Sequence, residues 1–187
     1  ADGEPVVLIH GFGADKDNWA MYAPQLTKKY RLISPDLPGF GENSHDPDLD
    51  YSMAAQAERL KGFLDALGIN KPHLGGNSMG GYIVLQYAVD FPDALKTLTL
   101  FNNAGIMSNE TKSELALDAE KGINPLDIDG PDDLVRMMAL AAYKPVKLPG
   151  QFRKVFFEEF SKNRELQNQI FWVLVEDGAA NPLDDRL

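Results

Sequence analysis

The segment Gly75-Gly76-Asn77-Ser78-Met79-Gly80-Gly81 joins two stretches of different character and is the strongest indication of the fold. Residues 72–74 before it favour a strand, and the apolar run 82–89 after it favours a helix. Four glycines around one serine permit a very sharp strand-to-helix turn, because glycine lacks the side chain that such a turn excludes. A turn of this kind strains the backbone of Ser78 and directs a helix N-terminus at its hydroxyl.

The five residues Gly76 to Gly80 match the pattern G-x-S-x-G, with Ser78 as the candidate nucleophile. The residues two before and two after the serine come too close for side chains, and Gly76 and Gly80 supply that clearance. The alternative is a tight structural turn in which Ser78 only caps the following helix. The motif alone leaves both possibilities open.

Strands and helices alternate over the first hundred residues. Strands are predicted at 5–9, 31–34, 72–77 and 96–101, and helices at 17–26, 52–67 and 79–89. Gly68 is expected to end the helix 52–67, and Asp15 or Asp17 can cap the helix 17–26. The alternation predicts an α/β fold whose parallel sheet carries helices on both faces.

The second part of the chain is predicted to be helical. Helices are expected at 110–121, 132–143, 151–161 and 164–176. We therefore assign 1–103 to the core and 104–187 to a helical cap inserted after the fourth strand. Most large apolar side chains of these helices are expected to pack on the core, and a minority to line an apolar pocket above Ser78. They are Met137, Met138, Leu140, Phe152, Val155, Phe156, Phe160, Ile170, Phe171, Trp172 and Leu174.

A second motif, His10-Gly11-Phe12-Gly13, directly follows the first predicted strand. Acyl transfer needs two N–H donors for the oxyanion of the tetrahedral intermediate. A glycine-rich loop can present one donor and the residue after the nucleophile the other, which predicts the amides of Phe12 and Met79. In a parallel sheet both motifs lie at the carboxyl ends of strands, where ligands bind. The alternative, a simple strand-to-helix turn, does not explain why the two motifs occur together.

Three stretches, VLIHGFGADKDNW, SPDLPGFGENS and GGNSMGGYIVLQYAVDFPD, resemble the α/β-hydrolase fold family, in particular its bacterial esterases and lipases. The resemblance covers about residues 5–103. It implies Ser78 as nucleophile and Phe12 and Met79 as oxyanion donors, with His10, Gly11, Gly76 and Gly80 as supporting residues. A serine rather than an aspartate at position 78 disfavours dehalogenase and epoxide hydrolase chemistry. Asp36 is expected to be structural and to hold the long loop after the second strand.

The catalytic base is not evident in the sequence. The resemblance implies an acid and a histidine on loops after the cap, and the three histidines do not fit that position. His10 belongs to the oxyanion loop, His73 lies ~16 Å from Ser78 if the strand is extended, and His45 could only swing in from its loop. Asn102 and Asn103 follow the fourth strand, where some relatives place an acid, but neither is acidic. We expect the base and acid beyond Leu187, and hence a fold that is incomplete on its C-terminal side.

Composition limits the partners. The 187 residues contain 18 Lys and Arg, 28 Asp and Glu and no cysteine, giving a formal net charge of −10. The acidic bulk surface disfavours nucleic acids and anionic headgroups. No apolar run reaches the ~20 residues that span a bilayer, and no metal or cofactor is expected. An exposed sheet edge would favour self-association or a complementary C-terminal fragment. The absence of cysteine leaves the compartment open.

The sequence therefore predicts a serine hydrolase that cleaves small-molecule or lipid carboxylic esters through an acyl-enzyme on Ser78. Two alternatives stay open. One is a carbon–carbon bond hydrolase on the same scaffold. The other is a catalytically inert, ligand-binding fragment, since the 187 residues alone are expected to be inactive without a base.

Overall fold

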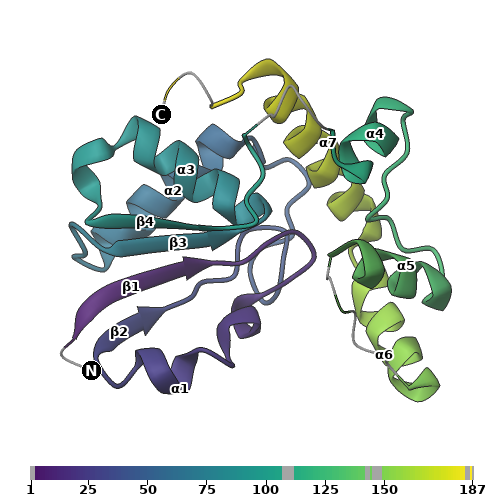
Figure 1. Ribbon diagram of the computed structural model, residues 1–187, viewed down its shortest axis with the longest axis horizontal. Coiled ribbons are helices and arrows are strands. Elements are labelled where there is room, and N and C mark those ends of the chain that lie inside the picture. The colour runs from purple at the N-terminus through teal and green to yellow at the C-terminus, as the bar shows by residue number, and fades with distance from the viewer. Residues whose placement is uncertain (1–2, 107–111, 142–143, 145–148, 184–185, 187) are drawn as a thin grey trace.

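A parallel sheet forms the centre of the protein, seen in a computed structural model that describes residues 3–106, 112–141, 144, 149–183 and 186 (Figure 1). Within these residues the strands are β1 (Glu4–Ile9), β2 (Tyr30–Ile33), β3 (His73–Asn77) and β4 (Thr97–Phe101), in the order β2-β1-β3-β4. All three pairings are parallel; Val6, for example, lies opposite both Leu32 and His73. The predicted parallel α/β core is confirmed.

Helices cover the two faces of the sheet unequally. The long helices α2 (Met53–Ala66) and α3 (Met79–Asp90) pack on one face, while η1 (Lys16–Trp19) and α1 (Ala23–Leu26) lie on the other (Figure 1). The short η2 (Pro92–Ala94) precedes β4. Alternate side chains of β1 point to opposite faces of the sheet. Val7 and Ile9 pack in the large core, and Val6 and Leu8 pack with Trp19 in a smaller cluster.

The prediction of one helix over residues 17–26 is wrong. The segment forms the 3-10 helix η1 and the single-turn helix α1, separated by residues 20–22. Pro24 lies in the first turn of α1, where its missing N–H is tolerated, but it could not continue a helix from η1 because that helix needs the N–H as a donor. Asp15 caps η1 by accepting the N–H of Asp17 at 2.9 Å, which decides between the two predicted caps.

The other predicted helices are present with shifted ends. The structure has α4 (Glu114–Glu120), α5 (Pro131–Ala141), α6 (Gly150–Ser161) and α7 (Arg164–Ala180). α4 begins later than predicted because Ser113 caps it, accepting the N–H of Ala116 at 3.2 Å. The predicted first residues 110–111 of that helix, and residues 142–143 at the predicted end of α5, lie outside the described residues.

Helix α7 connects the helical region to the sheet core. Its Ile170 and Phe171 are fully buried, and Ile170 packs so closely on Gly39 that a β-carbon there would lie 2.5 Å from Ile170 Cδ1. The Tyr82 hydroxyl donates to the carbonyl oxygens of Asp177 and Asn181, at 3.2 and 3.0 Å. Figure 1 shows α7 between the helices that cover the sheet and the helices α4 to α6.

A carboxylate of α7 also caps α2. Asp177 Oδ2 accepts the N–H of Met53, the first residue of α2, at 2.6 Å. We expect Asp177→Ala to lower the free energy of unfolding by about 1–2 kcal/mol, because a charge-assisted bond to a helix N-terminus is lost. Urea unfolding measures this, with Glu176→Ala, an exposed neighbour on α7, as the matched control. Equal losses in the two variants would contradict the capping role.

The sheet face beside α1 is only partly covered. A groove of about 410 Å³ runs over it and is lined by Trp19, Tyr30 and Phe101 among others. Met21 at its rim is 91% exposed and Tyr22 59%.

β4 is an edge strand that pairs only with β3 in the part of the chain that the structure describes, so the predicted exposed sheet edge is present.

Candidate active site

Ser78 has the strained backbone that the glycine-rich turn predicts. Its φ and ψ are 52° and −119°, and among the described residues other than glycine only Ser78 and Asn102 have a positive φ. The N–H of Ser78 donates to the Phe101 carbonyl at 3.1 Å, while its own carbonyl accepts from Tyr82 at 3.1 Å and Ala104 at 3.0 Å. The turn is therefore held by β4 and by the first turn of α3, which offset the cost of the positive φ.

The hydroxyl of Ser78 does not cap α3. Ser52 and Ser113, at the corresponding positions of α2 and α4, each accept a backbone N–H three residues on, from Ala55 at 3.3 Å and Ala116 at 3.2 Å. Ser78 makes no such bond, and no side chain among the described residues hydrogen-bonds its Oγ. The structural alternative, a serine that only caps the helix, is therefore wrong.

The glycines on either side of Ser78 are required by close backbone contacts. A β-carbon on Gly80 would lie 2.6 Å from the Ile9 carbonyl oxygen and would overlap that of His10. A β-carbon on Gly76 would lie 2.5 Å from the carbonyl carbon of Gly80. Backbone atoms cannot rotate away as a flexible side chain can. The start of α3 is thus pressed against the end of β1.

The loop after β1 reaches the serine itself. A β-carbon on Gly11 would lie 3.0 Å from Asn77 Oδ1 and 3.1 Å from Ser78 Cβ. The two sequence motifs, which are about 65 residues apart, therefore meet at the carboxyl-terminal edge of the sheet. This is where a doubly wound sheet binds its ligands.

His10 orients the peptide that carries one of the predicted oxyanion donors. The ring is fully buried, its Nε2 accepts the N–H of Leu37 at 2.9 Å, and its Nδ1 lies 2.8 Å from the Gly11 carbonyl oxygen. These partners assign the proton to Nδ1, which donates to Gly11. That carbonyl and the N–H of Phe12 belong to the same peptide group, so the bond fixes the plane of the Phe12 amide.

The environment of His10 keeps its ring neutral. Burial lowers the pKa, because it disfavours the charged imidazolium. The hydrogen bond to Gly11 and the charges of Asp36 and Asp15 act in the opposite direction but do not reverse the shift. Only the neutral ring can accept from Leu37, so the hydrogen bond and the lowered pKa favour the same state.

The two residues predicted as oxyanion donors are held by packing. The ring of Phe12 makes edge contacts with Phe40, at a centroid distance of 5.5 Å, and with Phe171 of α7, at 6.2 Å. The side chain of Met79 is fully buried. Neither amide N–H donates to another residue in the described ranges, so both are available beside Ser78.

Asp36 has the structural role that the sequence predicts. Its carboxylate accepts the N–H groups of Lys16 at 2.7 Å and Glu42 at 3.0 Å and pairs with the Lys16 ammonium at 3.0 Å. Burial alone would raise the pKa of Asp36, but these hydrogen bonds and the Lys16 charge hold the pKa below its usual value. Asp36 thus ties the loop after β2 to η1.

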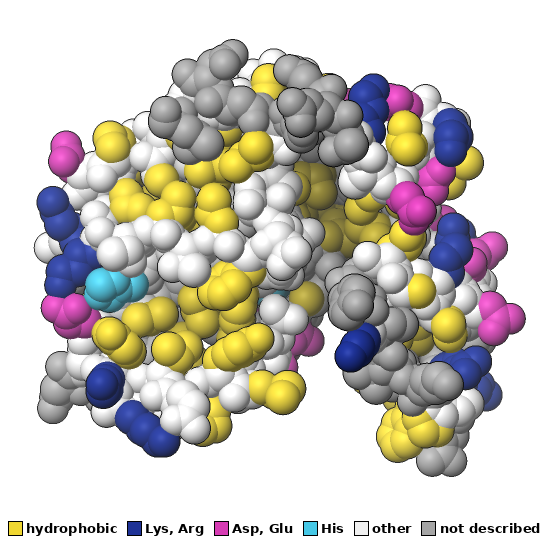
Figure 2. Space-filling view, viewed as in Figure 1, with side chains coloured by type: hydrophobic (Ala, Val, Ile, Leu, Met, Phe, Trp, Pro, Cys, Tyr) yellow, Lys and Arg dark blue, Asp and Glu magenta, His cyan; other side chains and the backbone are white. Residues whose placement is uncertain are grey.

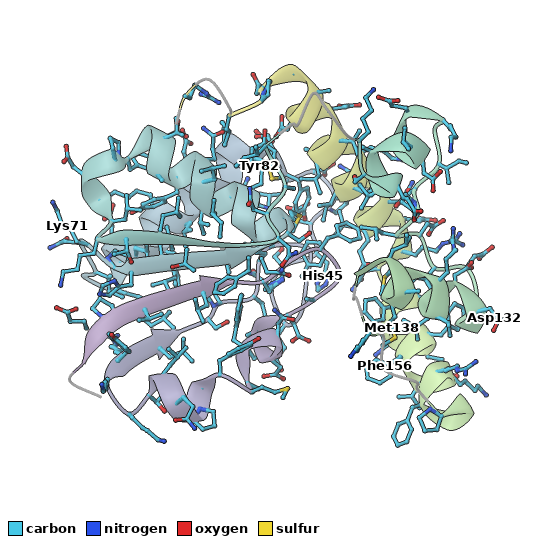
Figure 3. All side chains as sticks on the ribbon, in the orientation of Figure 1. His45, Lys71, Tyr82, Asp132, Met138 and Phe156 are labelled. Atoms are coloured by element: carbon cyan, nitrogen blue, oxygen red, sulfur yellow. The ribbon has the colours of Figure 1, made fainter. Side chains whose placement is uncertain are left out.

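Among the described residues, none of the three histidines forms a hydrogen bond with Ser78. His10 is committed to Leu37 and Gly11. His73 lies at the amino-terminal end of β3, with its ring nitrogens 3.0 Å from Glu4 Oε2 and 2.9 Å from Thr97 Oγ1. His45 lies on the loop between β2 and α2 (Figure 3).

Asn103 follows β4, where some relatives place an acid. Its side-chain amide donates to the Ala104 carbonyl oxygen at 2.9 Å, and a β-carbon on Gly81 would lie 2.5 Å from Asn103 Cβ. The side chain therefore packs against the first turn of α3. Across the described ranges, no three His, Asp or Glu side chains are grouped to hold a metal ion.

The neutral state of His10 predicts a pH dependence of stability. The unfolded chain binds a proton at His10 below a pKa of about 6.5, whereas the folded chain takes up that proton only at a lower pH, because burial lowers the pKa. Stability should therefore fall as pH drops from 7 towards 5.5, by at most about 1.4 kcal/mol per pH unit. In His10→Gln this contribution should be absent.

Urea unfolding at pH 7 and pH 5.5 measures the difference between the two proteins. His45→Gln, which removes a half-buried histidine on a loop, is the matched control and should keep the pH dependence. A wild-type protein as stable at pH 5.5 as at pH 7 would refute the assignment of His10.

The class of α/β hydrolases is defined by three features that are present here. They are a parallel sheet, a serine with positive φ between strand and helix, and a glycine-rich loop against that serine. The comparison with known families agrees: residues 4–130 match the model of the alpha/beta hydrolase fold, and the chain belongs to this family. The chain is 43% identical to Lipase 1 of Psychrobacter immobilis over 176 residues, which are 94% of this chain and 55% of that lipase.

The chain is also similar to a phospholipase of known structure and to a hydrolase with a different printed activity. The crystal structure of a membrane phospholipase A, described as a bacterial virulence factor, matches with a TM-score of 0.91 and 38% identity over 99% of this chain and 59% of that one. The 2-hydroxymuconate semialdehyde hydrolase of Pseudomonas sp. is 37% identical over 66% of this chain and 44% of that enzyme. The chain thus spans about half the length of the curated relatives it matches.

Proposed function

We propose that the chain carries the nucleophile and the oxyanion loop of a serine hydrolase that cleaves carboxylic esters. The observation that carries this proposal is the state of the Ser78 hydroxyl. It is on a residue with φ of 52°, at the N-terminus of α3 and against Gly11, and within the described residues it does not cap the helix. A strained residue whose polar group is unused is a mark of a functional site.

In the proposed reaction Ser78 Oγ attacks the ester carbonyl and gives its proton to a base. The oxyanion that forms accepts hydrogen bonds from the N–H groups of Phe12 and Met79, and the helix dipole of α3 adds to their effect. Expulsion of the alcohol leaves an acyl-enzyme on Ser78, which water then hydrolyses. His10 acts as a positioning residue for Phe12 and takes no proton itself.

We propose that the base and its acid come from residues outside this chain, after Leu187. The support is that His10 and His73 are engaged elsewhere, and that His45 forms no hydrogen bond with Ser78 in the part of the chain that the structure describes. The 187 residues alone would then hold an oriented but unactivated serine. The segment that supplies the base would also cover the free edge of β4 and the groove beside it; a second copy of the chain is the alternative cover.

The proposed substrates are esters with an apolar acyl or alcohol part, including lipids. We assign residues 104–187 to a cap over the site, because Phe160 of α6 and Phe171 of α7 both approach the loop that carries Phe12. In sequence the chain is 43% identical to the lipase relative over 94% of its length and 37% identical to the 2-hydroxymuconate semialdehyde hydrolase over 66%. The higher sequence identity to the lipase favours ester hydrolysis over carbon–carbon bond hydrolysis.

Product analysis with the full-length protein of the gene tests the proposal. A p-nitrophenyl ester of medium chain length and a dienoate diketone are offered in parallel. We expect release of p-nitrophenol and no cleavage of the diketone. Cleavage of the diketone alone would establish the carbon–carbon bond hydrolase instead, and turnover of neither substrate would favour a binding protein.

A further inference from the structure

Residues 124–129 connect α4 to α5, and Arg164 fastens them to the start of α7; we call them the clamped segment. Arg164 is the first residue of α7, and its guanidinium donates two parallel hydrogen bonds to the Asp127 carboxylate, each at 2.7 Å. A third hydrogen bond joins Arg164 to Asp129 at 2.6 Å. The bidentate bond depends on arginine, because a planar guanidinium presents two parallel N–H groups to one carboxylate and a lysine cannot.

The ion pair is not placed where it would add much stability. A helix N-terminus carries a partial positive charge, which disfavours a cation in the first turn. The two carboxylates offset that repulsion, and the hydrogen bond from Arg164 holds the pKa of Asp127 below its usual value. The side chains of Arg164 and Asp127 are nonetheless 40% and 32% exposed, and ion pairs exposed to water contribute little to the free energy of unfolding. These observations favour a role in positioning the clamped segment.

The clamped segment lies against the oxyanion loop. Its Ile128 is buried, and the small hollow that Ile128 and Arg164 line is also lined by Phe12 and Phe160. The hollow has a volume of about 10 Å³, which is room for about one water molecule. An ester group does not fit into it. The clamped segment therefore supports Phe12 from the cap side and does not bind substrate at this point.

Helix α7 gives the clamped segment a fixed base. Phe171 of α7 is fully buried, and its ring contacts Phe12 at a centroid distance of 6.2 Å. Asn124 of the clamped segment also donates to Asn168, one turn after Arg164, at 3.0 Å. On the face shown in Figure 2, a notch separates the lower part of the helical region from the sheet core, and hydrophobic side chains lie where the two meet above it. The attachment to α7 therefore sets the position of the clamped segment relative to Phe12.

We propose that Arg164 is a positioning residue for the oxyanion loop: it holds the clamped segment against Phe12 and so keeps the Phe12 N–H directed at the oxyanion. The inference rests on the proposed function for the role of that N–H, whereas the attachment itself needs no catalysis. An oxyanion donor must lie about 2.7–3.1 Å from the oxygen it stabilises, and a displacement of about 1 Å can cost about 100-fold in rate. Because the hollow admits no part of the substrate, the effect falls on kcat and not on KM.

Kinetics of the full-length protein test the proposal. Arg164→Met should lower kcat for a p-nitrophenyl ester about tenfold, with KM within about threefold, and Arg164→Lys should recover only part of the loss. Asp127→Ala should lower kcat by a similar factor, and the double variant with Arg164→Met should be no slower than either single variant, because both remove the same bond. Lys121→Met, which breaks an exposed ion pair with Asp118 in the helical region, is the matched control and should keep the wild-type kcat.

Hydrogen exchange in the full-length protein gives a second measurement that does not depend on activity. The Ala14 N–H donates to the Gly11 carbonyl oxygen at 3.3 Å, so its exchange reports opening of the oxyanion loop. Arg164→Met should speed this exchange at least about fivefold, and Lys121→Met should leave it unchanged.

The outcomes separate this proposal from the proposed function. An unchanged kcat in Arg164→Met, a loss confined to KM, or exchange at Ala14 equal to that of the wild type would overturn the positioning role. So would a double variant with Asp127→Ala whose losses simply multiply. Undiminished turnover in Ser78→Ala would overturn the catalytic assignment instead, and the exchange result at Ala14 would still decide whether Arg164 holds the loop.

Discussion

Replacing Ser78 with alanine is expected to abolish labelling by a fluorophosphonate probe and to lower kcat for ester hydrolysis by about 10⁴-fold or more in the full-length protein. Alanine removes the only atom that can form the acyl-enzyme. Binding of the ester should persist, because the oxyanion amides and the surrounding apolar residues are unchanged. The loss should therefore fall on kcat and leave KM within about threefold.

The same substitution should change stability by less than about 0.5 kcal/mol. The Ser78 hydroxyl has no hydrogen-bond partner among the described residues, and alanine keeps the β-carbon at the same positive φ. Ser52→Ala gives the converse result: the cap of α2 is lost, at about 1 kcal/mol, while labelling is retained. This pair of variants separates a hydroxyl used for chemistry from one used for structure.

Undiminished turnover in Ser78→Ala would end the assignment of the nucleophile. The unactivated 187-residue chain offers a further comparison. If the base lies outside it, the chain should react with the probe far more slowly than the full-length protein does, although its Ser78 has the same backbone. Equal labelling of both would show instead that the base lies within the chain, with His45 as the remaining histidine.

The core of this fold could be predicted from sequence because its signals are local. Helix α2 has a capping serine at residue 52, apolar residues at steps of three and four, and Gly68 in a left-handed conformation at its end. The turn at Ser78 is likewise coded by its own neighbours. The wrong prediction in this region is the single helix at 17–26. It followed the helical pattern and gave too little weight to Pro24, which prevents one continuous helix.

The contacts that complete the site are not local, and the sequence gives no signal for them. Leu37 holds His10 from 27 residues away, and Asp177 caps α2 from 124 residues away. The apolar patterns of α6 and α7 are similar, yet Phe171 is fully buried and Phe156 is 45% exposed. Which apolar helix packs on the core depends on where the chain returns to it, and periodicity alone does not encode that position.

The sequence also does not predict that the Ser78 hydroxyl leaves the helix N-terminus uncapped. By sequence Ser52, Ser78 and Ser113 are all plausible caps, each just before a helix. Only the backbone geometry distinguishes them: Ser52 and Ser113 have ψ of 150° and 157°, which direct the side chain to the helix N–H groups, whereas Ser78 has ψ of −119°. The glycines produce that difference, so the motif that predicts chemistry also removes the hydroxyl from its ordinary structural use.

The second large effect is expected from a single β-carbon at Gly80. Gly80→Ala should lower the free energy of unfolding by about 3 kcal/mol or more, because the added carbon would lie 2.6 Å from the Ile9 carbonyl oxygen and overlap that of His10. Both atoms belong to the backbone at the end of β1, so relief requires α3 or the oxyanion loop to move. Urea unfolding measures the loss, and fluorophosphonate labelling of the full-length protein measures the displacement.

Gly62→Ala is the matched control for Gly80→Ala. Gly62 is in the middle of α2, and a β-carbon there would have no neighbour within 4 Å. The same chemical change should then stabilise the protein by about 0.5–1 kcal/mol, because alanine favours the helix over the unfolded chain. Opposite signs from one added carbon would locate the cost of the first substitution in the contact between α3 and β1. A Gly80→Ala variant as stable as the wild type and labelled at the same rate would show that α3 does not press on this loop, and the close approach of the two motifs would lose its physical basis.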